Sequence, residues 1–139
     1  MRLNHSRAAY GFLLLLAVSP ALATIAAGQP AGPAPITVKG TAFPIPVTAG
    51  TYDLYDLVVD FPPGSATPRH YHGGPVVITV ITGELTLQRS GGERVVTAGD
   101  SFIENPGDVH ALVNKGTTGA RVAASELIPK GAAETTIVK

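Results

Sequence analysis

The sequence contains no cysteine among its 139 residues. A disulfide framework is therefore excluded, and so is a lipid-modified cysteine behind an export signal. Charged residues make up only 14% of the chain, and the ten basic residues equal the ten acidic residues in number. Because no run of lysine and arginine could neutralise a phosphate backbone, nucleic acid is not an expected partner.

Helical periodicity and long apolar runs are also missing. After residue 30, no segment combines the spacing of an amphipathic helix with capping residues. The apolar stretch from Ala8 to Ala27 is broken by Ser19 and Pro20, and its continuous part is much shorter than the ~20 residues that cross a bilayer. We therefore expect no helical domain and no stable membrane insertion once the N-terminal signal described next has been removed.

The first 23 residues have the pattern of a secretory signal peptide. Arg2 and Arg7 precede an apolar segment at residues 11–18, and Ala21-Leu22-Ala23 has the small-x-small form at which signal peptidases cut. Cleavage is expected after Ala23, with Ala27 as a second site. The pattern predicts a periplasmic or secreted protein, and the alternative is an N-terminal membrane anchor.

The rest of the sequence divides into a leader and one domain. Residues 24–35 consist mostly of Ala, Gly and Pro, which predicts a flexible leader. Residues 36–139 have the usual length of a single domain, and the chain as a whole is 45% hydrophobic, enough to form one core. Short apolar segments separated by turn residues every 8 to 12 positions predict an all-β sandwich or barrel.

Most of the predicted strands are apolar on one or both sides. Alternation along residues 52–61 would bury Tyr55, Leu57, Val59 and Phe61 on one face of a sheet. Two earlier segments are short and limited by proline, so we expect them at sheet edges; they are residues 36–40 and 43–47. The remaining predicted strands are residues 76–82, 84–89, 93–98, 101–105, 109–114 and 120–128.

Two histidines lie two residues apart in the segment PRHYHGGP, residues 68–75. In an extended strand, His70 and His72 point to the same side and could share a metal ion. His110 begins a later predicted strand, and closure of the sheet could bring it to the same point. Three imidazoles suit divalent transition ions and leave an open position for water or substrate. The alternative is that each histidine is a solvated residue near a strand end.

Around these histidines the sequence resembles the two motifs of the cupin superfamily. The first motif is glycine, five residues, His-x-His, three or four residues, glutamate, six residues and glycine. Residues 64–83 match every spacing of this motif. The second motif is glycine, five residues, Pro-x-Gly, two residues, histidine, three residues and asparagine. Residues 99–114 match it, except that the proline stands one place later, at Pro106.

The resemblance implies a single antiparallel β-barrel of the cupin, or jelly-roll, type over residues 36–139. It also implies that His70, His72 and His110 bind a divalent metal ion, Fe, Mn, Ni or Zn, beside a small-molecule ligand or substrate. Because cupins often pair, it further implies a homodimer. We therefore expect an exported metal-binding cupin that acts on a small organic molecule, with an oxygenase as the first reaction to test. The alternatives are a non-catalytic cupin that binds a metal or small ligand, and a dimerising structural module.

One position departs from the cupin pattern. Val76 stands four residues after His72, where cupins usually carry a metal-binding glutamate, and valine cannot donate to a metal. Its parity equals that of His70 and His72, so Val76 should still face inward. A three-histidine site without a carboxylate resembles the thiol-dioxygenase branch of the superfamily.

Another acid could replace the missing glutamate. Glu104 lies in the predicted strand just before the turn to His110. An inward Glu104 would supply a fourth metal ligand or accept a hydrogen bond from an imidazole N–H. The alternative for Glu104 is a solvated side chain at the end of its strand. Glu84, beside a hairpin turn, has the position of a solvated glutamate.

Overall fold

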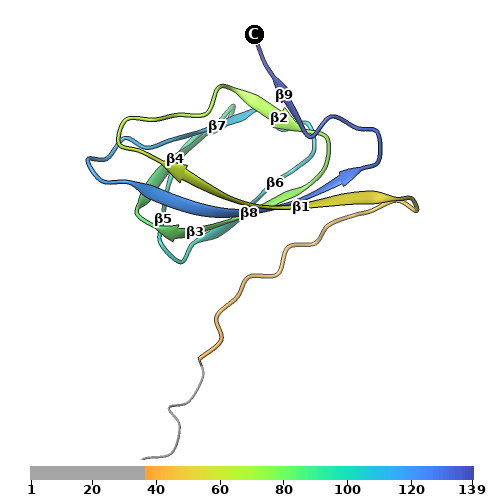
Figure 1. Cartoon of the computed structure of the whole chain (residues 1–139), viewed down its shortest axis with the longest axis horizontal. Helices are drawn as coiled ribbons and strands as arrows, with labels where there is room; N and C mark the ends of the chain where they lie inside the picture. Colours follow the sequence, from red (N-terminus) through yellow and green to blue (C-terminus); the bar gives the residue numbers. More distant parts are fainter. Residues whose placement is uncertain (1–36) are drawn as a thin grey trace, which may run out of the picture. The chain divides into compact units, whose positions relative to one another are not determined.

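The computed structural model describes residues 37–139, which form nine β-strands and no helix (Figure 1). Residues 39–139 make up one structural unit. The predicted signal peptide and leader, residues 1–35, lie outside the described residues. Within residues 37–139, no helix is long and apolar enough to cross a membrane.

The strands form two antiparallel sheets. The four-stranded sheet has the order β1 (Tyr52–Phe61), β8 (Ala120–Pro129), β3 (Val76–Thr82), β6 (Ser101–Glu104). The five-stranded sheet has the order β5 (Gly92–Thr97), β4 (Glu84–Arg89), β7 (His110–Val113), β2 (His70–His72), β9 (Thr135–Ile137). The prediction of an all-β fold is therefore confirmed.

The predicted closure into one barrel is not observed, because the strand pairing leaves two separate sheets. The order of the strands explains this difference. Every connection except the β4–β5 hairpin carries the chain from one sheet to the other, so consecutive strands seldom pair with each other. Two sheets joined by crossing connections have the arrangement of a jelly roll.

The hydrophobic core draws side chains from both sheets. Along β1, Phe61 is buried and Leu57 and Val59 pack against the core, whereas Leu54 and Val58 are exposed. The alternation predicted for this strand is thus confirmed. The buried core residues are Phe61, Val76, Ile78, Val80, Leu85, Leu87, Val96, Phe102, Leu112, Ala120, Val122 and Ala124.

The two predicted N-terminal edge strands are wrong in their described part, because residues 37–40 and 43–47 contain no strand. Pro44 and Pro46 lack the N–H groups that a strand needs for pairing. One short strand that was not predicted, β9, lies beside β2 near the C-terminus (Figure 1). β9 pairs with β2 at three positions, whereas β7 pairs with β2 at one. The C-terminal segment therefore provides most of the pairing of the strand that carries His70 and His72.

Glycine is required where β2 passes into β3. A Cβ atom at Gly74 would lie 2.1 Å from the carbonyl oxygen of Leu127 in β8. Only a residue without a side chain allows the two backbones to approach this closely. Gly74 therefore lets the chain cross from the five-stranded sheet to the four-stranded sheet directly after His72.

Candidate metal centre

The three predicted histidines come together in the structure. His70 and His72 lie on β2 and His110 lies on the adjacent β7, where His70 and His110 are direct strand partners. All three side chains are buried. One ring nitrogen from each lies within 4.8 Å of the others, and the ring centres are 4.4 to 5.3 Å apart. The alternative of three solvated histidines is excluded by this burial.

The backbone sets the tautomer of each histidine. The Nδ1 atoms of His70, His72 and His110 lie 2.7, 3.0 and 2.8 Å from the carbonyl oxygens of Pro68, Glu134 and Asp108, respectively. Because a carbonyl oxygen can only accept, Nδ1 carries the hydrogen and donates it. Nε2 is then left with a free lone pair, and this is the arrangement usually found in histidines that bind metals.

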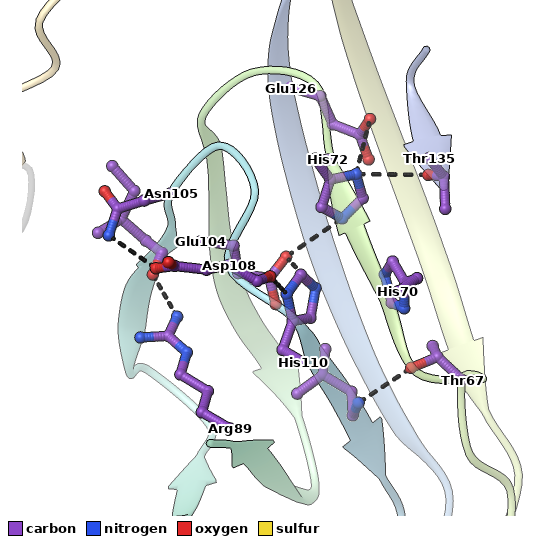
Figure 2. A network of polar contacts seen from close by, with 12 residues as sticks. Thr67, His70, His72, Arg89, Glu104, Asn105, Asp108, His110, Glu126 and Thr135 are labelled. Carbon is purple, nitrogen blue, oxygen red and sulfur yellow. Dashed lines mark hydrogen bonds and ion pairs between the residues drawn. The ribbon is translucent and has the colours of Figure 1, made fainter. Parts of the chain in front are cut away.

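Glu104 faces the histidines, as predicted for an inward side chain (Figure 2). It is 1% exposed, so the solvated alternative is wrong. Its Oε2 atom lies 3.1 Å from Nε2 of His110 and 3.5 Å from Nε2 of His72. A carboxylate oxygen and an imidazole nitrogen that lacks hydrogen both accept, so a proton or a cation is needed between them. Nε2 of His110 and Oε1 of Glu104 have no hydrogen-bond partner.

A second buried glutamate, which sequence reasoning missed, lies on the other side of His72. Glu126 is 4% exposed, and its Oε2 atom lies 3.9 Å from Nδ1 of His72 without a hydrogen-bond partner (Figure 2). The alternation of buried and exposed positions in the predicted strand at residues 120–128 indicates that Glu126 faces inward. Glu126 has the same parity as the buried Val122 and Ala124, so it had to face inward with them.

The charges of the centre influence one another strongly. Burial alone would raise the pKa of Glu104, but the contacts with His110 and His72 outweigh it and hold that pKa at about 2. Burial opposes a charge on His72, yet Glu104 and Glu126 together raise the pKa of His72. Burial lowers the pKa of His70 and raises that of Glu126. The centre therefore contains an ionised carboxylate that attracts positive charge to the histidines.

A small cavity of about 80 Å³ adjoins the histidines. Its volume matches only two or three water molecules, since each occupies about 30 Å³ in the liquid. The cavity could hold an ion with a few ligand atoms, but not a drug-sized molecule. It is lined by the three histidines, Glu104, Glu126, Thr67, Val59, Phe61, Ile78, Leu112, Val122 and Ala124.

Two packed β-sheets with a buried histidine cluster between them define a jelly-roll protein with a candidate metal centre. The chain belongs to the cupin family, because the family model for the cupin domain matches residues 57–126, half of the chain. The predicted membership is thereby confirmed. No curated protein sequence matches this chain significantly.

Several solved structures are similar to this chain. A protein with a double-stranded β-helix domain from Klebsiella pneumoniae has 29% identity and a TM-score of 0.54 over 66% of this chain and 79% of that one. A sugar phosphate isomerase from Silicibacter pomeroyi has 26% identity and a TM-score of 0.51, with coverages of 53% and 50%. An oxalate oxidase in complex with the substrate analogue glycolate has 30% identity and a TM-score of 0.53, with coverages of 61% and 46%. The match spans about half the length of each of the two enzymes.

Proposed function

We propose that this protein is an exported metal-binding cupin that acts on a small organic molecule at a three-histidine centre. The observation that carries the proposal is the state of His70, His72 and His110, which are buried, close together and held by the backbone with Nε2 free. Neutral imidazoles of this kind suit Fe, Ni and Zn, and an added carboxylate extends the set to Mn. Glu104 faces the same nitrogens and is the candidate for a fourth ligand.

An oxygenase reaction is the first to test. When bound, a divalent ion would polarise a substrate oxygen or activate O₂ or water. The chain would restrict the substrate to a compact molecule, because the cavity measures only about 80 Å³. Phe61, Ile78 and Leu112 would exclude water from its apolar side. Both an oxalate oxidase and a sugar phosphate isomerase occur among the similar structures, which supports chemistry on small oxygen-rich molecules.

A non-catalytic cupin that binds a metal or a small ligand is the second candidate. Val76 favours it, because this position holds a buried aliphatic side chain in place of the carboxylate expected from the cupin motif. The remaining parts of the proposal come from the sequence. Export is supported by the signal-peptide pattern of residues 1–23. A homodimer is supported by the frequent pairing of cupin domains.

Metal content tests the centre directly. The mature chain would be purified without a histidine tag from cells grown without added nickel, and its metal measured by elemental analysis. We expect about one ion per chain in the parent and almost none in the His70→Ala, His72→Ala double variant or in His110→Ala. Tyr71→Phe, between the two histidines on β2, is the matched control and should keep the metal. Equal trace metal in all of these proteins would refute the centre.

Oxygen consumption then separates the two candidate functions. Uptake would be followed with thiols, diols and phenolic compounds as substrates. An oxygenase would consume O₂ with at least one class, and His110→Ala would abolish this consumption. A parent protein that binds its metal and a ligand from the panel without consuming O₂ would support the non-catalytic cupin.

A further inference from the structure

Val76 is flanked within the four-stranded sheet by two glutamates. It pairs in register with Glu104 on β6 and with Glu126 on β8. Residues that pair directly across antiparallel strands project to the same side, with Cβ atoms roughly 4.5 to 5.5 Å apart. Since Val76 is fully buried, all three side chains project into the interior. A carboxylate thus stands on each side of the position where the cupin motif has one.

The centre gathers most of the buried polar atoms that lack a partner. Residues 37–139 contain four such side-chain atoms, and three belong to this centre: Oε1 of Glu104, Nε2 of His110 and Oε2 of Glu126. The fourth is Nε of Arg89. Folded proteins leave few buried polar atoms unpaired, and each one needs an explanation. A cation between Glu104 and Nε2 of His110 would account for the atoms of these two residues.

The two glutamates occupy different sides of the His72 ring. Glu104 approaches Nε2 of His72, the nitrogen with the free lone pair, at 3.5 Å. Glu126 approaches Nδ1, the nitrogen that donates to the backbone, at 3.9 Å. Only Glu104 is therefore on the side of the ring where a metal would bind. Glu126 stands behind the ligand, where its charge acts on the ring through space, because Nδ1–H itself is donated to the Glu134 carbonyl.

We propose that Glu104 and Glu126 together replace the carboxylate that position 76 lacks, Glu104 as a metal ligand and Glu126 as a positioning residue behind His72. This inference rests on the proposed function, because it presupposes an ion at the histidines. The two carboxylates also balance the charge of a divalent ion. Because carboxylate oxygen suits Mn²⁺ better than it suits Zn²⁺, Glu104 shifts the preference of the centre toward Mn²⁺.

Metal selectivity tests the role of Glu104. The dissociation constants of Mn²⁺ and Zn²⁺ would be measured for the metal-free parent, Glu104→Gln and the exposed control Glu84→Gln. Glu104→Gln should weaken Mn²⁺ binding by about tenfold or more and should weaken Zn²⁺ binding less. Glu84→Gln should change neither constant. Equal affinities in Glu104→Gln and the parent, or equal losses for both ions, would overturn the ligand role.

Moving the carboxylate back to β3 provides a second test. The double variant Val76→Glu, Glu104→Val exchanges two side chains that face each other in the sheet. It should recover the Mn²⁺ preference that Glu104→Gln loses. If the double variant folds but prefers Mn²⁺ over Zn²⁺ no more than Glu104→Gln does, a carboxylate at position 76 cannot replace the one at position 104, and the proposal is contradicted. If circular dichroism shows that the double variant does not fold, the result for Glu104→Gln decides the question.

Glu126→Gln tests the positioning role, because it keeps the shape of the side chain and removes its charge. It should weaken Mn²⁺ and Zn²⁺ binding equally, by about tenfold. The metal-free variant should melt at the same temperature as the parent or higher, because a buried carboxylate oxygen without a partner has been removed. Unchanged metal affinity, or a parallel loss of stability in the metal-free protein, would overturn this role.

The outcomes distinguish this inference from the function on which it rests. A parent that binds no metal, or histidine variants that still bind it, would refute the three-histidine centre itself. If the parent binds metal through its histidines and Glu104→Gln binds it with the same affinity, only the proposed replacement of the carboxylate is refuted.

Discussion

The two sheets contribute to the centre in different ways. The five-stranded sheet provides the three histidines, and the four-stranded sheet provides Glu104 and Glu126. Each histidine ring donates a hydrogen bond to a backbone carbonyl, whereas each glutamate keeps an oxygen without a partner. The five-stranded sheet therefore presents imidazole nitrogens whose orientation is already fixed. The four-stranded sheet presents two carboxylates, of which Glu104 faces the free Nε2 atoms and Glu126 lies behind His72.

The largest expected effect comes from breaking the connection between the sheets. Gly74→Ala would place a Cβ atom 2.1 Å from the Leu127 carbonyl oxygen, so the backbones must separate. We expect the free energy of unfolding to fall by about 3 kcal/mol, as measured by urea denaturation. Gly91→Ala is the control, because nothing lies within 4 Å of its added Cβ. Equal stabilities of the two variants would show that the close approach at Gly74 is unimportant.

A change of pH should act on the histidine sheet while Glu104 stays ionised. The pKa of His72 is raised above its usual 6.5, and the pKa of Glu104 is about 2. As the pH falls through the raised pKa of His72, a proton therefore takes Nε2 of this residue while Glu104 is still ionised. Metal affinity should fall by about tenfold per pH unit for each proton displaced. Titrations with Zn²⁺ would measure this, and a constant affinity over the range would contradict it.

The smallest effect is expected on the outer face of the four-stranded sheet. Asp60 on β1 accepts hydrogen bonds at 2.6 and 3.0 Å from Arg121 on β8, and this contact lowers the pKa of Asp60. Both side chains are exposed, so water and salt screen the pair. Asp60→Asn should shift the melting temperature by less than about 3 °C and leave metal affinity unchanged. A large loss of metal affinity would show that the outer face influences the centre.

The sequence predicted the histidine cluster because local rules determine it. The spacing of His70 and His72 gives them the same parity in a strand, and the second motif adds His110 at a fixed distance from its turn. The same parity rule placed Val76 inward, which the structure confirms, and of the two positions left open for Glu104 the structure shows the inward one. The parity rule also predicts an inward Glu126, because this residue is the only acid in the strand at residues 120–128 and has the parity of the buried Val122 and Ala124.

The features that were predicted wrongly depend on contacts between distant residues. Separation into two sheets depends on which strands pair, and β1 takes β8 as its partner from the far end of the chain. The strand β9 has little apolar pattern of its own and exists through its pairing with β2. Residues 43–47 show the opposite case, since their apolar residues suggested a strand that Pro44 and Pro46 prevent.

The hydrogen bonds from Nδ1 to the backbone have a consequence for how this centre can be altered. The acceptors for His70 and His110 are carbonyl oxygens only two residues earlier in the chain, and that for His72 comes from the C-terminal segment. For His70 and His110 these acceptors are backbone atoms alone, so side-chain substitutions around the centre leave the tautomers of these two rings in place; Nδ1 of His72 also lies 3.3 Å from the hydroxyl of Thr135. Glu104 and Glu126 can then be substituted one at a time. The charge beside the ion could thus be changed on the four-stranded sheet while the histidines of the five-stranded sheet keep their positions.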